Sequence, residues 1–140
     1  MTNDNLQNEE ILIEFYQGSL GHTVIIICKN IAHLERLQEI FKALSQGNEK
    51  SFQIEKELHN VKLVNLYSLC LEVKAEIQGF SDNKVVMKRE GKNITFSWSR
   101  SSEGWSSSVG LIERLIVSDK PNHTFLADDD FLIEINYKEH

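Results

Sequence analysis

Two separated parts of the chain carry the residues best suited to chemistry. Glu103 stands at the start of a helical pattern, and His123 lies in a later polar segment that ends in Asp128, Asp129 and Asp130. A carboxylate beside an imidazole can act as an acid–base pair, and oxygen-rich loops can hold a hard cation. Three consecutive aspartates rarely converge on one ion, so we expect no metal and no other cofactor.

The same residues also have ordinary structural roles. His123 can bond backbone groups where the chain leaves a helix, Asp128–Asp130 can form a solvated turn, and Glu103 can interact with the positive end of a helix. The sequence contains no phosphate-binding glycine loop, no G-x-S-x-G elbow and no H-E-x-x-H helix. The ordinary structural roles of these residues, together with the absence of these three motifs, favour a protein that is not an enzyme.

Aromatic residues provide a different kind of candidate, as contacts for a partner. Phe96, Trp98 and Trp105 lie in a segment rich in serine, but no serine has a base at a recognisable spacing. We expect Phe96 and Trp98 to pack in the core. Tryptophan is enriched where interfaces bind most strongly, so we include Trp105 among the predicted partner contacts.

Charge is distributed unevenly along the chain. The formal net charge is −6, from 15 Lys and Arg against 21 Asp and Glu. Residues 1–28 and 119–140 are acidic, whereas residues 84–100 are basic. The chain lacks the large basic field with which proteins bind nucleic acid, so we expect no nucleic-acid partner. An acidic surface favours a basic protein partner.

The chain has 140 residues and a mass of 16.1 kDa, which fits one domain, with residues 1–9 as a frayed tail. No basic and apolar leader opens the sequence, and the longest strongly apolar run, Val24–Cys28, is too short to cross a bilayer. We therefore expect a cytoplasmic protein with no membrane contact. Cys28 and Cys70 show no metal-ligand spacing and are expected to be free, buried thiols.

The elements that position these residues follow from hydrophobic periodicity. Alternation predicts strands at Ile11–Tyr16 and His22–Cys28, joined as a hairpin by a glycine-containing turn. Apolar residues at intervals of three or four then predict a helix over Ile31–Gln46, with Asn30 as its N-cap and Gly47 as its C-cap.

The second half of the chain adds further strands and one helix. In chain order we expect mostly loop over residues 48–60, with a short extended piece around Phe52–Ile54 as an alternative, then a long strand within Val61–Ile77 and a hairpin of Val85–Arg89 and Ile94–Arg100. A helix at Trp105–Val117 capped by Ser106 or Ser107, a loop at Asn122–Asp130 and a closing strand at Phe131–Tyr137 follow. The order ββαβββαβ predicts an α+β two-layer sandwich. It combines a mostly antiparallel sheet of about six strands with two helices.

Five short segments carry a resemblance to known proteins. They are Trp98-Ser99, Glu103-Gly104-Trp105, Gly110–Leu115, His123-Thr124-Phe125-Leu126 and Ile133-Glu134-Ile135. Over about residues 94–138 the chain resembles small bacterial proteins with a Trp motif, a short helix, a His-x-aromatic-Leu turn and a final strand. Many small acidic proteins of this kind are immunity proteins, so the resemblance implies neutralisation of a toxin by direct binding.

The leading hypothesis is therefore a non-enzymatic binding protein of the immunity type, whose partner is a basic toxin domain. The predicted partner contacts are Glu103, Trp105, Asp128, Asp129 and Asp130. One alternative is a structural module that self-associates as a homodimer through an exposed edge strand. The other is a small hydrolase that uses Glu103 and His123, which requires the two side chains to meet.

Overall fold

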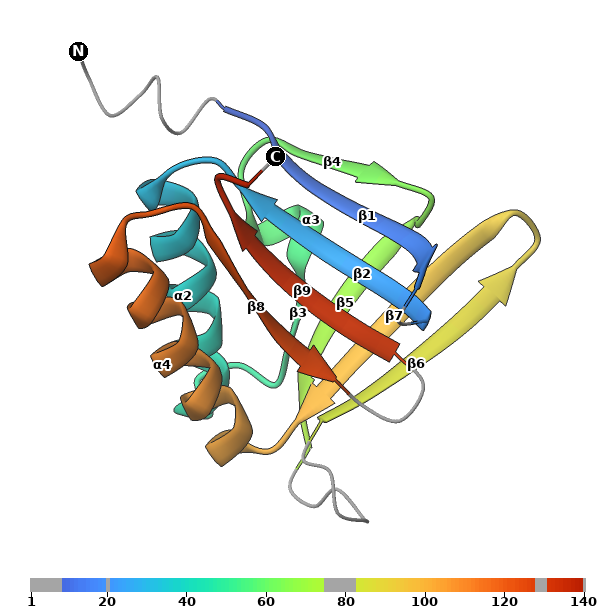
Figure 1. Ribbon diagram of the computed structural model, residues 1–140. Helices are drawn as coiled ribbons and strands as arrows, with labels where there is room; N and C mark the ends of the chain where they lie inside the picture. The colour runs from blue at the N-terminus through green and yellow to red at the C-terminus, as the bar shows by residue number, and fades with distance from the viewer. Residues whose placement is uncertain (1–8, 20, 75–82, 128–130, 140) are drawn as a thin grey trace.

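The protein has an α+β fold, as the order of elements predicted. The computed structural model describes residues 9–19, 21–74, 83–127 and 131–139. In this part of the chain nine strands form two sheets, accompanied by three helices (Figure 1). The expectation of about six strands in one sheet and two helices is wrong in number, because one predicted strand is divided in two and segments predicted mostly or wholly as loop contain two further strands and a short helix.

The five-stranded sheet has the order β4-β1-β2-β9-β8 and faces the viewer in Figure 1. Its strands are β1 (Ile11–Gly18), β2 (Gly21–Cys28), β4 (Val61–Val64), β8 (Asn122–Ala127) and β9 (Phe131–Tyr137). The predicted hairpin of β1 and β2 is confirmed, and β8 also runs antiparallel to β9. The pairs β1–β4 and β2–β9 are parallel. The sheet is therefore mixed, and its central pairing joins the two ends of the chain.

The four-stranded sheet has the order β3-β5-β7-β6 and lies behind the first (Figure 1). Its strands are β3 (Ser51–Gln53), β5 (Ser68–Val73), β6 (Asn83–Glu90) and β7 (Asn93–Arg100). The predicted hairpin of β6 and β7 is confirmed, with Gly91 at φ +62° in its turn. Parallel pairing of β5 with β7 places the hairpin beside the middle of the chain.

Two sequence predictions fail at strand boundaries. The apolar run from Val61 holds two strands instead of one, because Asn65 adopts φ +66° and redirects the chain between the two sheets. A left-handed residue of this kind is typically Gly, Asn or Asp. The segment Asn122–Ala127, predicted as loop, is the edge strand β8. Polar residues are tolerated there because β8 pairs with one neighbour only, so Asn122 and His123 stay exposed to water.

The two longer helices, α2 (Ile31–Ser45) and α4 (Ser102–Ser118), pack against each other beside the sheets (Figure 1), while α3 (Ile54–Glu57) is one turn. The Asn30 cap is confirmed, since its Oδ1 accepts the N–H of His33, and Gly47 follows the last turn at φ +75°. The cap of α4 is Ser101, not Ser106 or Ser107. Among the described helices, none has the length and apolar character needed to cross a membrane.

One aromatic core joins both sheets and the helix pair. Phe15 of β1 contacts Phe96 of β7, so the inner faces of the two sheets meet there. Phe41 of α2 packs on the rings of Trp98 and Trp105, and both tryptophans are fully buried. The predicted core placement of Phe96 and Trp98 is therefore confirmed. The core leaves one broad surface of the five-stranded sheet turned away from it.

Candidate binding face

The outer face of the five-stranded sheet is crossed by no described helix or strand (Figure 1). Because side chains alternate along a strand, every second residue points outward. The register aligns the outward side chains in rows across the sheet. We call these side chains the outer face: Lys62 and Val64 of β4, Leu12, Glu14 and Tyr16 of β1, Thr23, Ile25 and Ile27 of β2, Leu132, Glu134 and Asn136 of β9, and His123 and Phe125 of β8.

Apolar side chains occupy the middle of the outer face. Ile25 and Ile27 of the central strand are only 3% and 4% exposed, although no described helix or strand crosses them. Tyr16 and Phe125 remain 37% and 43% exposed. A hollow of about 120 Å³ lies between these two aromatic residues, above Leu132. The face thus offers exposed aromatic groups on an apolar floor.

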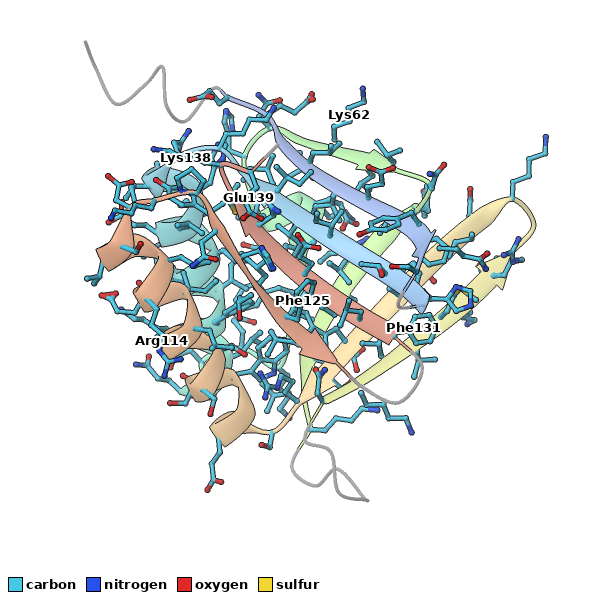
Figure 2. All side chains as sticks on the ribbon, viewed as in Figure 1. Lys62, Arg114, Phe125, Phe131, Lys138 and Glu139 are labelled. Atoms are coloured by element: carbon cyan, nitrogen blue, oxygen red, sulfur yellow. The ribbon has the colours of Figure 1, made fainter. Side chains whose placement is uncertain are left out.

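Carboxylates flank the apolar middle. Glu14 and Glu134 lie directly on either side of Ile25 in the sheet register. Glu139 follows β9 at the upper end of the same surface, and Lys62 is the lysine that β4 contributes (Figure 2). The strands and this turn therefore bring three carboxylates and one ammonium group to the outer face.

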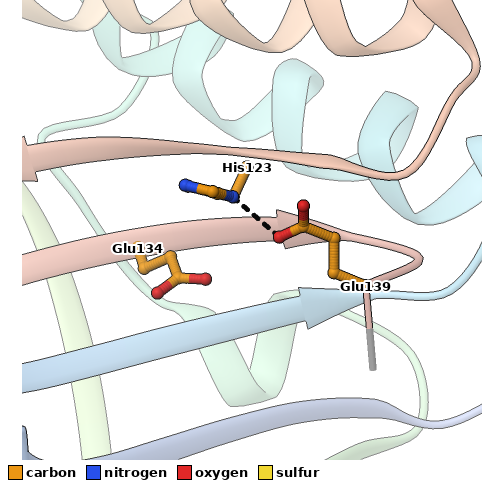
Figure 3. Close-up of side chains that lie close together, drawn as sticks. All are labelled: His123, Glu134 and Glu139. Atoms are coloured by element: carbon orange, nitrogen blue, oxygen red, sulfur yellow. Dashed lines mark hydrogen bonds and ion pairs between the residues drawn. The ribbon is translucent and has the colours of Figure 1, made fainter.

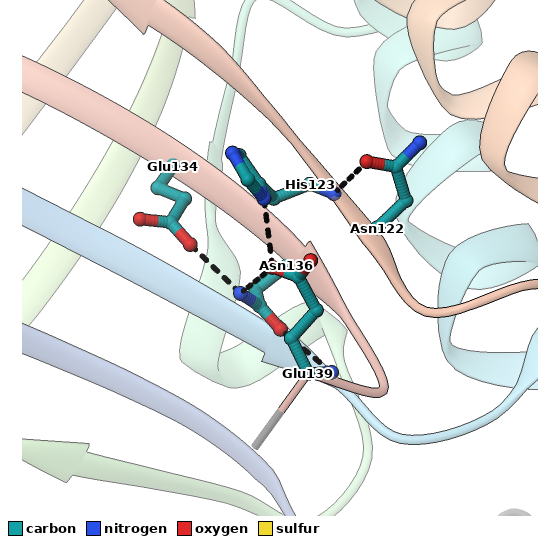
Figure 4. A network of polar contacts seen from close by, with 5 residues as sticks. All are labelled: Asn122, His123, Glu134, Asn136 and Glu139. Atoms are coloured by element: carbon teal, nitrogen blue, oxygen red, sulfur yellow. Dashed lines mark hydrogen bonds and ion pairs between the residues drawn. The ribbon is translucent and has the colours of Figure 1, made fainter.

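A polar network closes the end of this face nearest the chain's C-terminal turn. Nδ1 of His123 lies 2.7 Å from Oε1 of Glu139 (Figure 3). The Asn136 amide donates to Glu134 over 2.8 Å and to Glu139 over 3.0 Å, while its oxygen accepts the Glu139 N–H (Figure 4). Asn136 therefore holds two carboxylates and the turn after β9 together.

The structure does not support the hydrolase pair. Glu103 is exposed in the first turn of α4, whereas His123 follows the other end of that helix. A rise of 1.5 Å per residue separates Glu103 from the helix end by about 22 Å. His123 bonds instead to Glu139. The acid–base interpretation of Glu103 and His123 is therefore wrong, because the length of α4 keeps them apart.

The other predicted contacts have separate outcomes. Trp105 cannot touch a partner, because its ring is fully buried against Phe41 and Trp98 and its Nε1 donates to the Glu72 carbonyl over 2.8 Å. Its inclusion as a surface contact is wrong. Asp128, Asp129 and Asp130 lie outside the described residues. Glu103 is exposed, but it stands at the start of α4 and not on the outer face.

Neither thiol is activated for nucleophilic chemistry. Both cysteines are free, and Cys28 is buried as expected, whereas Cys70 is partly exposed. Burial raises the pKa of the Cys28 thiol to about 12. Burial, followed by the charges of Glu72 and Glu55, raises the pKa of Cys70 as well. Because the thiolate is the nucleophile, a raised pKa disfavours nucleophilic chemistry at both residues.

Two larger hollows lie elsewhere and hold no comparable combination of groups. One, of about 490 Å³, opens between Phe15, Tyr67 and Lys92. The other, of about 360 Å³, lies between α2 and the turn after α3 and is lined by His33 and His59. In that second hollow the Nδ1 of His33 accepts the Lys29 N–H over 3.0 Å, so this imidazole is part of the helix start.

Comparisons of the chain with models of protein families, with curated proteins and with solved structures found no match. The resemblance to immunity-type proteins therefore stays a prediction. The functional argument rests on the chain's own geometry.

Sequence reasoning did not assemble the outer face. The alternation of Leu12, Glu14 and Tyr16 against the core residues of β1 was visible, and so was that of β9. What joins them is the parallel pairing of β2 with β9, two strands from opposite ends of the chain. No local pattern encodes that pairing.

Proposed function

We propose that this protein is a non-enzymatic binding protein of the immunity type, which captures a basic protein such as a toxin domain on the outer face of its five-stranded sheet. The observation that carries the proposal is the uncovered sheet face itself, on which exposed Tyr16 and Phe125 stand among carboxylates. Soluble folds seldom leave contiguous apolar patches exposed unless they bind something.

The aromatic residues supply the binding energy in this account. Tyrosine and phenylalanine remove a large apolar area from water with few rotatable bonds, and such residues near the centre of an interface contribute most of its affinity. Tyr16 and Phe125 flank a shallow hollow that a partner side chain can fill. A broad sheet face with a depression of only about 120 Å³ suits a protein surface better than a small molecule.

The carboxylates supply charge complementarity. Glu14, Glu134 and Glu139 give this surface the same sign as the whole chain, whose net charge is −6. Complementary charge accelerates encounter and rejects acidic competitors, and its effect weakens with salt. The proposal places this interaction in the cytoplasm, where two free cysteines remain reduced.

The experiment that tests the function is affinity capture by the tagged full chain from the source cell's lysate, at low and at high salt. We expect one stoichiometric basic protein that is released by salt, and that protein's own activity, assayed with and without this chain, to be blocked. The matched variants are Phe125→Ala on the outer face and Val86→Ala on the four-stranded sheet, because Val86 is similarly exposed at 45%.

Three results would refute the proposal. The first is capture that Phe125→Ala leaves intact. The second is a partner whose activity is unaffected by binding. The third is a chain that captures nothing and has the mass of a homodimer in solution, which would establish the self-associating alternative.

A further inference from the structure

We propose that His123, Glu134 and Glu139 form a binding site for a divalent transition-metal ion, with Zn²⁺ as the representative ion. Among the described residues these are the one group of three or more His, Cys, Asp or Glu whose ligand atoms all lie within 4.8 Å of one another. The site goes beyond the proposed partner binding and does not depend on it, because metal uptake requires no partner.

The types of ligand select the metal. Zn²⁺ takes imidazole nitrogen and carboxylate oxygen at about 2.0–2.2 Å, which places neighbouring tetrahedral ligands about 3.3 Å apart. The ligand atoms here span separations from 2.7 Å to at most 4.8 Å, so small side-chain rotations bring them to that geometry. An imidazole ligand disfavours Ca²⁺ and Mg²⁺, which prefer oxygen ligands alone. The side chains of His123 and Glu139 are 38% and 33% exposed, so a water molecule can supply a fourth ligand.

The buried carboxylate of Glu134 is the second observation that points to a cation. Glu134 is only 8% exposed, and among the described residues it has no ion pair. Its one hydrogen-bond partner there is the neutral Asn136 amide. A buried carboxylate is costly unless a positive charge compensates for it. A divalent ion between Glu134, Glu139 and His123 supplies that charge.

The fold pre-organises the three ligands. His123 lies directly opposite Asn136 in the β8–β9 register, and Glu134 lies two residues before Asn136 on the same face of β9. The turn that presents Glu139 is fixed by its N–H, which donates to Asn136 over 3.1 Å. Asn136 thus holds both carboxylates in position through its amide, as residues behind metal ligands commonly do (Figure 4).

The test is calorimetric titration of the full chain with Zn²⁺, alongside thermal unfolding with and without the ion. We expect one Zn²⁺ per chain and a raised Tm. Loss of a residue that only positions a metal ligand lowers metal affinity about 10–100-fold, so loss of a ligand itself, in His123→Ala or Glu134→Gln, should weaken binding at least tenfold and reduce the Tm shift at the same Zn²⁺ concentration. The control variants are His59→Ala and Glu90→Gln, exposed residues of the same types elsewhere. Co²⁺ should produce visible absorption bands of a tetrahedral site.

Glu134→Gln keeps the size of the side chain, so it tests the site even if another variant unfolds. The proposal is overturned if the wild type binds no Zn²⁺, or if His123→Ala and Glu134→Gln bind it as well as His59→Ala does. If the wild-type chain binds Zn²⁺ but captures no partner, the proposed function alone is refuted. Intact capture without Zn²⁺ binding would refute this site alone.

Discussion

The outer faces of the two sheets differ in almost every property that matters for binding. Outward side chains of the five-stranded sheet include Leu12, Ile25 and Phe125, with carboxylates around them. On the four-stranded sheet most corresponding positions are small or charged, with Val86 as the exposed apolar exception: Ser68, Cys70, Glu72, Thr95, Ser97, Ser99, Lys84, Val86 and Lys88. The outer faces of the two sheets therefore differ in how much large apolar and aromatic surface they carry.

The contrast shows which surface is an ordinary solvated one. Serine and threonine side chains on a sheet face form hydrogen bonds with water and add little binding energy. Lysines on an edge strand discourage pairing with a strand of another molecule. The four-stranded sheet follows that pattern at Ser97 and Lys88. The five-stranded sheet departs from it at Tyr16 and Phe125, whose aromatic rings have no counterpart at the outward positions of β5, β6 and β7.

The largest expected effect concerns stability at the centre of each face. Ile25→Ala should lower the free energy of unfolding by about 2–4 kcal/mol, because it removes a buried side chain from the central strand. Ser97→Ala, the matched change on the four-stranded sheet, should alter it by less than about 0.5 kcal/mol. Urea denaturation of both variants measures the difference. Equal losses would show that the two faces are equivalent in packing.

The second effect concerns affinity. Phe125→Ala should weaken binding of the captured partner by about 2 kcal/mol, or about 30-fold in Kd, since it removes an aromatic contact. Val86→Ala, on the four-stranded sheet, should leave the Kd unchanged. Calorimetry with the purified partner measures both. A stronger effect of Val86→Ala would move the interface to the other sheet.

The third effect concerns the rate of association. Glu14→Gln should slow association several-fold at low salt and reduce its salt dependence, because it removes one carboxylate from the outer face. Lys88→Gln should not slow it, since that ammonium group belongs to the opposite sheet and repels a basic partner. Stopped-flow measurements at several salt concentrations distinguish the two. Slower association of Lys88→Gln would contradict the assignment of charge to the faces.

The smallest effect concerns acid. Burial lowers the pKa of His33 below its ordinary value of 6.5, and its Nδ1 accepts the Lys29 N–H, which a protonated ring cannot do. The folded chain therefore favours the neutral ring. Its contribution to stability is complete above pH 6.5 and is lost as the pH falls through the lower folded-state pKa.

We expect this loss to be smaller in His33→Gln and unchanged in His59→Gln, whose side chain is exposed. Denaturation at a series of pH values measures it. β3, β5, β6 and β7 contain no histidine, so this acid sensitivity belongs to the side of the molecule that holds α2 and the five-stranded sheet. An identical pH profile for wild type and His33→Gln would refute this origin.

Local pattern was sufficient for several elements of the fold. The helix from Ile31, the hairpin at Gly91 and the closing strand each carry a clear period and turn or cap residues, and each is present. The break at Asn65 was missed because strand-forming residues continue on both sides of it, and one backbone angle decides the outcome.

The candidate site was less predictable because it depends on distant pairing. His123 was singled out from the sequence, but its partners Glu134 and Glu139 become neighbours only when β8 folds back along β9. Trp105 was misplaced for a related reason. A tryptophan in the first turns of an amphipathic helix can point either way, and only the packing of α4 against Phe41 decides.

The most direct test of the account is hydroxyl-radical footprinting of the side chains, with and without the purified partner. Tyr16 and Phe125 report on the outer face, while Tyr67, which is 61% exposed between β4 and β5, serves as an internal control. The account predicts that the partner protects Tyr16 and Phe125 and leaves Tyr67 reactive. Protection of Tyr67 with unchanged reactivity of Tyr16 and Phe125 would contradict it.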